Sequence, residues 1–223
     1  MSKFKILGLL LYIEECVMEG TVNVNNYLKM TIGSLCLIIL IICIAFNLTE
    51  NMDASIYQLL HRTMSSEIIV QYLTMISTVF SPIACLCMVL IILLGLLIYD
   101  RFKCVWYGFW CFSVFAIGTF LKYAIQRPRP SAAIDGYSFP SMHVLSVCIL
   151  VSLIVLLVKH KAVIFIGAIL ILSIMISRIY LQAHYFTDTI ASLCVLYILI
   201  QTLYIEFETK GIFSVIFKKS NNT

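Results

Sequence analysis

Six long apolar stretches run through this sequence, and no Lys, Arg, Asp or Glu lies in the central part of any of them. They cover residues 30–48, 74–99, 104–123, 142–158, 162–180 and 187–205. About 20 consecutive apolar residues are enough for a helix to cross the hydrocarbon core of a bilayer. The sequence therefore predicts an all-α integral membrane protein, in which a bundle of six transmembrane helices forms one domain over 30–205.

The composition supports a membrane protein over a soluble one. Of the 223 residues, 62% are hydrophobic and only 12% are charged, whereas a soluble domain needs a charged surface. The net charge of +4 is spread over the connecting segments, so we expect no nucleic-acid partner. Most of the nine cysteines lie inside the apolar stretches, without the spacing of a metal site, and we interpret them as packing residues. No metal or other cofactor is predicted.

The two ends of the chain differ from the predicted bundle. The segment "ILGLLLYI" (6–13) is too short to span a membrane, and acidic residues follow it without a small-residue cleavage site. We interpret residues 1–29 as an N-terminal segment that lies at the membrane interface. Residues 206–223 form a basic tail.

The distribution of Lys and Arg predicts the orientation of the chain. Six spans place both termini and the second and fourth connecting loops on one side. Ten of the 15 basic residues lie on that side: Lys3, Lys5, Lys29, Arg101, Lys103, Lys159, Lys161, Lys210, Lys218 and Lys219. The other five are Arg62, Lys122, Arg127, Arg129 and Arg178. Because basic residues favour the cytoplasmic side, we expect a multi-pass protein of the cell membrane with both termini in the cytoplasm.

Two polar clusters, far apart in the sequence, should meet at the extracytoplasmic ends of helices 3–6. Lys122 ends the third predicted helix and His143 opens the fourth. Arg178 ends the fifth helix, and His184 and Asp188 open the sixth. The end of an odd-numbered helix and the start of the next lie on the same face of the membrane. Since charged groups at membrane depth are costly, their convergence indicates a functional site.

The chemistry of this predicted site suits a phosphate group. Lys122, Arg129 and Arg178 together form a strongly cationic cluster, and guanidinium groups match the geometry of phosphate oxygens. Ser141 and His143 lie at the expected start of a helix, where free backbone N–H groups favour anions. These features predict a site for a polyanion.

The spacing of His184 and Asp188 suits catalysis. Four residues apart on a helix, the two side chains face the same side, so the carboxylate can fix the tautomer of the imidazole. A structural hydrogen bond that caps the helix is the alternative for this pair alone. Together with His143 and the cations, the pair suggests phosphoryl transfer without metal, in which one histidine attacks and the other protonates the leaving oxygen.

Three motifs carry a resemblance to a known family. They are "KYAIQRPRP" (122–130), "PSMH" (140–143) and "SRIYLQAHYFTD" (177–188). In their order and separation they resemble the signatures of the type-2 phosphatidic acid phosphatase superfamily of membrane lipid phosphatases. The resemblance covers about residues 30–205.

This resemblance implies a role for each matching residue. His184 would be the nucleophile that forms a phosphohistidine, with Asp188 as its partner, and His143 would be the general acid. The implied phosphate-binding residues are Lys122, Arg129, Ser141, Met142 and Arg178. Family members are generally metal-independent.

Met142 departs from the family pattern, which has glycine at this position. Glycine is required where φ is positive or where the backbone must approach a ligand closely. We expect Met142 to have a helical φ, because it lies at a helix start, and its N–H to remain available to phosphate.

The substrate implied by the resemblance is a lipid phosphate in the bilayer. Small bacterial members with an outward-facing site dephosphorylate undecaprenyl pyrophosphate, the carrier lipid of cell-wall synthesis, and this is the substrate we favour. Phosphatidylglycerophosphate and phosphatidic acid are alternatives, as is phosphotransfer to an acceptor other than water. An inactive relative is a further alternative, raised by Met142. An anion transporter is less favoured, because the predicted spans carry no polar cluster at mid-membrane.

Three further predictions concern the surroundings of the site. Arg127 should lie at the lip of the site or contact the headgroup, since the spacing assigns Arg129 to the phosphate. Residues 53–67 should form a helix on the outer surface. Pro82 should kink the second transmembrane helix.

Overall fold

The computed structural model describes residues 25–220, with side chains described up to residue 205. Within this range the chain forms only helices and their connections. The helices are α2 (Asn25–Ala45), α3 (Glu50–Thr63), α4 (Glu67–Val79), α5 (Pro82–Tyr99), α6 (Arg101–Ile125), α7 (Met142–Val158), α8 (Lys161–Tyr180) and α9 (Phe186–Ser220). Most of the predicted interfacial segment at residues 1–29 lies outside the described residues.

All six predicted apolar stretches are helical, but the second is divided in two. The prediction that Pro82 kinks a continuous helix is wrong. Instead, α4 ends at Val79 and a new helix, α5, begins at Pro82. The Ser81 hydroxyl accepts a hydrogen bond from the Ala84 N–H at 3.3 Å and caps this helix. Proline is well suited to the first position of a helix, where its missing N–H costs nothing.

Five of the helices are long and apolar enough to cross a membrane. They are α2, α5, α6, α8 and the Phe186–Ile205 part of α9. The sixth predicted span, α7, is apolar but has only 17 residues, so a six-span topology stays a prediction. The backbone of α9 continues past the predicted end at residue 205 to Ser220, since the end of an apolar stretch does not by itself end a helix.

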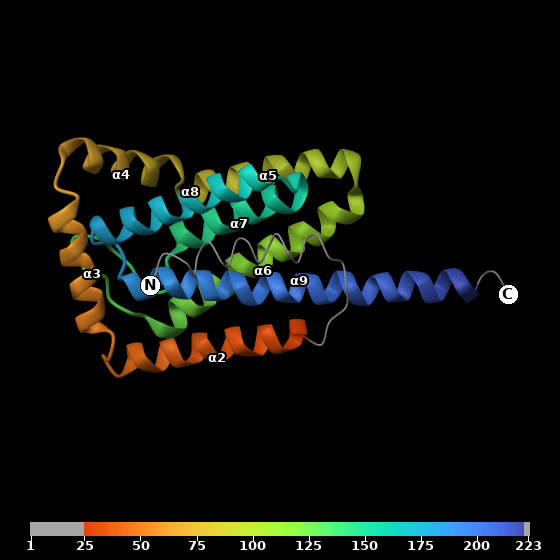
Figure 1. Cartoon of the computed structure of the whole chain (residues 1–223), viewed down its shortest axis with the longest axis horizontal. Helices are drawn as coiled ribbons and strands as arrows, with labels where there is room; N and C mark the ends of the chain where they lie inside the picture. The colour runs from red at the N-terminus through yellow and green to blue at the C-terminus, as the bar shows by residue number, and fades with distance from the viewer. Residues whose placement is uncertain (1–24, 221–223) are drawn as a thin grey trace.

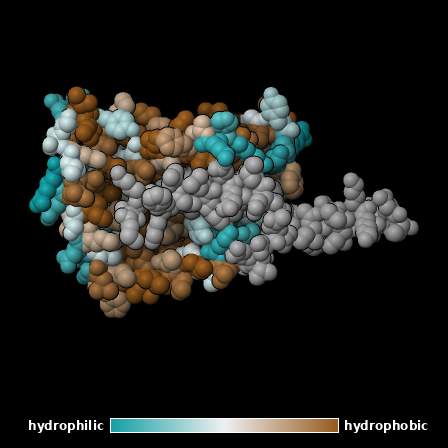
Figure 2. Space-filling model, viewed as in Figure 1, coloured by the Kyte–Doolittle hydropathy of each residue, from teal (hydrophilic) through white to brown (hydrophobic). Residues whose placement is uncertain are grey.

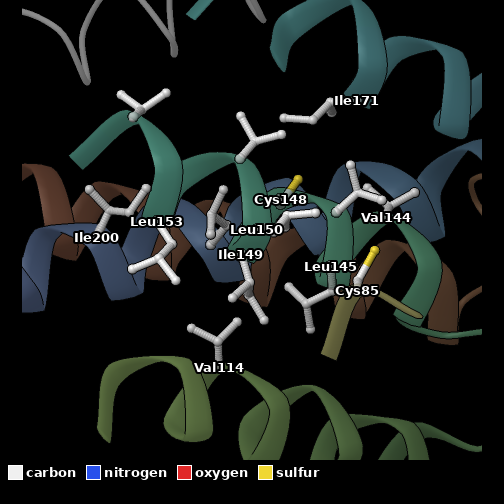
Figure 3. Close-up of a cluster of buried hydrophobic side chains, with 14 of the residues drawn as sticks. Cys85, Val114, Val144, Leu145, Cys148, Ile149, Leu150, Leu153, Ile171 and Ile200 are labelled. Atoms are coloured by element: carbon white, nitrogen blue, oxygen red, sulfur yellow. The ribbon is translucent and has the colours of Figure 1, made fainter. Parts of the chain in front are cut away.

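The core of the bundle is built around α7, which packs against α5, α6, α8 and α9. Its side chains are buried on all sides, and Val144, Leu145, Ile149 and Leu153 have no exposed surface. Figure 3 shows these side chains between the neighbouring helices, with Val114 of α6 facing them. A helix that is apolar all round needs such a complete enclosure by other helices.

The exposed surface of the bundle is apolar in the middle and polar at its ends. Figure 2 shows a hydrophobic band between hydrophilic regions at the two ends of the helices. Large exposed hydrophobic side chains on α2, α5 and α6 contribute to this surface, among them Ile32, Leu35, Ile91, Leu94, Phe112 and Phe120. Such a continuous apolar surface fits the hydrocarbon of a bilayer, and the chain is a multi-pass membrane protein.

The helix predicted over 53–67 is observed as α3, at Glu50–Thr63. It lies across one end of the bundle in Figure 1 and contacts α8 and α9. At this end α2, α6 and α8 end, while α7 and α9 begin. The connecting segments 126–141 and 181–185 belong to the same end, where the predicted polar clusters also lie.

Gly118 allows α6 to pack closely against α7, and this generates a first prediction. A Cβ at this position would overlap the Leu145 side chain and lie 3.3 Å from the Met142 sulfur. We expect Gly118→Ala to destabilise the bundle by about 1–3 kcal/mol, because overpacking forces helices apart. Thermal unfolding in detergent measures this. Gly95→Ala on α5 is the control, since a Cβ there meets nothing within 4 Å. Equal melting temperatures for both variants would contradict the close packing.

Candidate active site

The structure brings all the predicted site residues to the α3 end of the bundle. Lys122 lies in the last turn of α6, Arg178 in the last turn of α8 and Asp188 in the first turn of α9. The remaining residues lie in the connecting segments or at the start of α7: Arg129, Ser141, Met142, His143 and His184.

His184 is oriented by a backbone carbonyl. Its ring is 3% exposed, and Nδ1 lies 2.6 Å from the Ser138 carbonyl oxygen. Because a carbonyl only accepts hydrogen bonds, Nδ1 carries the proton and donates it. Nε2 then carries the lone pair, which accepts a long hydrogen bond from Nη1 of Arg129 at 3.4 Å. An imidazole in this tautomer can act as a nucleophile through Nε2.

Burial keeps the His184 ring neutral. His184 lies in the loop between α8 and α9, and burial lowers its pKa to about 4, from an ordinary value of 6.5. Asp188 acts in the opposite direction, whereas the positive charges of Arg178 and Arg129 lower this pKa further. The ring therefore stays unprotonated at neutral pH, as a nucleophile must.

Asp188 lies near His184 without a direct hydrogen bond to it. Its Oδ2 is 3.8 Å from Nδ1 of His184, and the same oxygen accepts a hydrogen bond from the Tyr185 N–H at 2.9 Å. Its Oδ1 accepts from Nη1 of Arg127 at 2.8 Å. The ring N–H instead donates to the Ser138 carbonyl oxygen. The sequence did not predict this contact, because every residue type has a backbone carbonyl.

Lys122 connects α6 to the segment that precedes α7. Its ammonium group donates hydrogen bonds to the carbonyl oxygens of Tyr137 at 2.8 Å and Pro140 at 3.1 Å. An ammonium group has three donors, so one remains for a ligand. Lys122 therefore fixes the loop and still contributes positive charge to the site.

Arg129 is held in the loop by two carbonyl groups. Its Nε donates to Asp135 at 3.0 Å, and its Nη1 donates to Ala183 at 2.9 Å. The second of these contacts places the guanidinium beside His184, one residue further along the chain. Nη2 remains available to an anion.

Two buried polar groups at this end of the bundle have no hydrogen-bond partner within the described part of the chain. One is Nε of Arg178, whose Nη1 donates to the Ser77 hydroxyl at 2.7 Å. The other is the hydroxyl of Ser141, which is fully buried. Buried polar groups are nearly always paired, and leaving one unpaired costs about 1–3 kcal/mol. Both are donors, and an oxyanion is a ligand of the kind that pairs with such donors.

His143 lies within electrostatic range of His184 and of three cationic residues of the site. These residues are Lys122, Arg129 and Arg178. Its ring makes no hydrogen bond to any described residue, which leaves both ring nitrogens available to a ligand. The position fits the role of a second histidine that exchanges a proton with a phosphate ester.

Met142 adopts the conformation expected for it. It is the first residue of α7, and it is absent from the residues with positive φ, which confirms the expectation of a helical backbone. Its sulfur points to the space left by the missing side chain of Gly118 on α6. The first N–H groups of a helix have no partner within it, so those of α7 are open to an anion.

Arg127 is largely buried and does not lie at an exposed lip, which corrects that part of the sequence-based prediction. It does line the cavity beside His184, and a contact with the lipid headgroup stays a prediction. Its side chain is only 10% exposed and forms ion pairs with Asp188 and Asp53, each at 2.8 Å. Asp53 belongs to α3, and nothing in its sequence context marks it as part of the site. The spacing in "RPRP" correctly separated Arg127 from Arg129 but did not show that Arg127 faces inward.

A cavity of about 710 Å³ borders His184. Its apolar wall comes from α2 and the end of α6 and includes Ile41, Ile44, Ala124 and Ile125. Its polar wall includes Asn47, Thr49, Glu50, Asp53, Gln126, Arg127 and Gln182. Lys122, Arg129, His143 and Arg178 are not among its lining residues, so the cavity lies beside the cationic cluster and not within it.

Two comparisons with known proteins give matches to this chain or its fold. The family model described as "PAP2 superfamily" matches residues 103–211, which include all three sequence motifs. No significant match is found among curated proteins. The crystal structure described as the first transmembrane PAP2-type phosphatidylglycerolphosphate phosphatase from Bacillus subtilis has the same fold. It is 24% identical, with a TM-score of 0.69, and the match covers 82% of this chain and 96% of that one.

The lowered pKa of His184 predicts how stability depends on pH. Between about pH 6.5 and pH 4 the unfolded chain binds a proton at this residue and the folded chain does not, so stability falls as the pH falls through this window. We expect the melting temperature of His184→Asn to decline less steeply there than that of the wild type. Parallel pH profiles of the two proteins would contradict a buried, neutral His184.

Proposed function

This chain belongs to the PAP2 superfamily and is a phosphatase, and we propose that it removes phosphate from a membrane lipid phosphate or diphosphate. The proposed reaction is the conversion of undecaprenyl pyrophosphate to undecaprenyl phosphate. The observation that carries the proposal is the orientation of His184. Its Nε2 lone pair faces Arg129, while Ser138 holds the proton on the other nitrogen.

The proposed first step forms a phosphohistidine. Nε2 of His184 attacks phosphorus, and the bond between phosphorus and the leaving oxygen breaks. His143 donates its proton to that oxygen, so the lipid product leaves with a neutral hydroxyl or a protonated phosphate. Asp188, next to Nδ1 of His184, stabilises the positive charge that develops on the imidazole.

The proposed second step releases inorganic phosphate. His143, now unprotonated, accepts a proton from a water molecule as that water attacks the phosphohistidine. The P–N bond breaks, and His184 returns to its starting tautomer. Through both steps Lys122, Arg129 and Arg178 would neutralise the phosphoryl oxygens, and the Ser141 hydroxyl would donate to one of them.

Metal ions have no role in this proposal. Within the described residues, no group of three or more His, Cys, Asp or Glu side chains could hold one. The three cationic side chains supply the positive charge that Mg²⁺ supplies in many phosphoryl-transfer enzymes.

The surroundings of the site suit a lipid substrate. The apolar outer surface places the bundle in the bilayer, with the cationic cluster at one end of the helices. The cavity beside His184 offers an apolar wall, which includes Ile44 and Ile125, to the part of the lipid next to its phosphate. We propose that this end is extracytoplasmic, because most of the basic residues outside the site lie at the other end.

Phosphatidylglycerophosphate is the second candidate substrate. The solved structure that shares the fold is described as a phosphatidylglycerolphosphate phosphatase. Both substrates present a terminal phosphate on an apolar anchor. They differ in the leaving group, which is a phosphate in one and a glycerol hydroxyl in the other.

Phosphate release from a panel of lipids tests the proposal. The purified protein is assayed in detergent, with chelator present, on undecaprenyl pyrophosphate, phosphatidylglycerophosphate and phosphatidic acid. We expect release from undecaprenyl pyrophosphate to be fastest, and His184→Ala to lower it by at least about 10³-fold, because the nucleophile is lost. His160→Ala is the matched control, since His160 is exposed and caps α8 at the far end of the bundle. Activity retained by His184→Ala, or abolished by chelator, would contradict the mechanism.

The role of His143 predicts a dependence on the leaving group. His143→Ala should slow phosphatidylglycerophosphate hydrolysis more than undecaprenyl pyrophosphate hydrolysis, because an alkoxide needs protonation more than a phosphate does. The ratio of the two kcat values measures this effect. An equal loss for both substrates would argue against proton donation by His143.

A further inference from the structure

Asp53 is a buried carboxylate on a helix that lies at the end of the bundle. It is 4% exposed and accepts three hydrogen bonds. Its Oδ1 accepts from the Thr187 N–H at 3.0 Å, and its Oδ2 accepts from the Thr187 hydroxyl and from Nη2 of Arg127, each at 2.8 Å. A buried carboxylate is tolerated only with such complete pairing. Asp53 thus attaches α3 to the first turn of α9.

Arg127 bridges Asp53 to Asp188. Its Nη2 bonds to Asp53 and its Nη1 bonds to Asp188, while its Cζ lies 3.9 Å from the centre of the Tyr185 ring. The planar guanidinium can hold two carboxylates in a fixed relation, which an ammonium group cannot do. The position of Asp188 therefore depends on a contact made by α3.

Arg127 also connects to His184 through its backbone. Its carbonyl oxygen accepts hydrogen bonds from the N–H and the hydroxyl of Ser138, at 2.8 Å and 3.2 Å. Ser138 in turn holds Nδ1 of His184. Both groups next to Nδ1, the Ser138 carbonyl and the Asp188 carboxylate, are thus fixed by the same arginine.

We propose that Asp53 is a positioning residue for the nucleophile. By holding Arg127 and Thr187, it fixes Asp188 and the orientation of the His184 ring, although it touches neither of them directly. The docking of α3 on the end of the bundle is thereby coupled to catalysis. This inference rests on the proposed function, in which His184 attacks phosphorus.

Asp53→Asn separates this role from simple support of α3. The amide retains an oxygen that accepts from the Thr187 N–H but removes the charge that pairs with Arg127. We expect kcat to fall by about 10- to 100-fold, because small displacements of a reacting group have effects of this size. KM should change by a smaller factor than kcat, since Asp53 lines the cavity beside His184 but is not one of the proposed phosphate-binding residues. Glu67→Gln is the matched control: it removes an exposed carboxylate from the first turn of α4.

Hydrogen exchange gives a readout that needs no substrate. The Tyr185 N–H donates to Asp188 and does not touch Asp53. In Asp53→Asn it should exchange faster, because Asp188 loses the arginine that is held by α3. In Glu67→Gln its exchange should match that of the wild type.

The outcomes are distinguishable. A wild-type kcat together with wild-type exchange at Tyr185 in Asp53→Asn would overturn the positioning role. If the wild-type protein releases phosphate from no lipid, the proposed function fails, and the exchange measurement still decides whether Asp53 controls Asp188.

If Asp53→Asn does not fold, Arg127→Lys provides the second test. It keeps the charge but cannot bridge both carboxylates, so it should show the same loss in kcat and the same faster exchange, and wild-type values for both would overturn the inference.

Discussion

Ionised side chains are costly in hydrocarbon, and the candidate membrane spans carry none in their central turns. The charged groups that these helices do hold within the site, such as Lys122 and Arg178, lie in terminal turns at one end. Because α7 is apolar on all sides, it takes the centre of the bundle and presents its first residues, Met142 and His143, to the same end. The exclusion of charge from the bilayer thus concentrates the chemistry of the protein in a single layer.

Within that layer the contacts form two groups with different tasks. Arg129, Arg178 and Ser141 keep donors that bond to no described residue, and these donors are suited to a phosphate. Both terminal nitrogens of Arg127 donate to protein side chains, and both oxygens of Asp53 accept hydrogen bonds from the protein. The two arginines of "RPRP" therefore have different surroundings although they are two residues apart. Arg129 keeps a donor for the proposed phosphate, whereas Arg127 bonds to residues that surround the proposed nucleophile.

Apolar length and helix parity were sufficient to predict most of the helices and the convergence of Lys122, His143 and His184 at one end of the bundle. Motif spacing was sufficient to indicate the superfamily whose model matches residues 103–211. The break at Pro82 was not predicted, because a proline inside an apolar stretch is compatible with both a kink and a new helix. The role of Ser138 was beyond sequence reasoning, since its contact is a backbone carbonyl.

The contribution of Asp53 was equally hidden. Its contacts with Arg127 and Thr187 are long-range, and a single acidic residue in an amphipathic helix normally faces water. Only the docking of α3 onto the start of α9 shows that it is buried. Polar groups that act through another residue carry no local sequence signal, whereas residues that touch the substrate are constrained by motif spacing.

The measurement that tests the central claim most directly is the identification of the covalent intermediate. The protein is mixed with substrate labelled in the terminal phosphate, quenched in alkali within milliseconds, digested and analysed by mass spectrometry. The account predicts an acid-labile, alkali-stable phosphate on His184, and none in His184→Ala. Phosphate on another residue, or phosphate release in a single turnover with no labelled protein at any time, would contradict it.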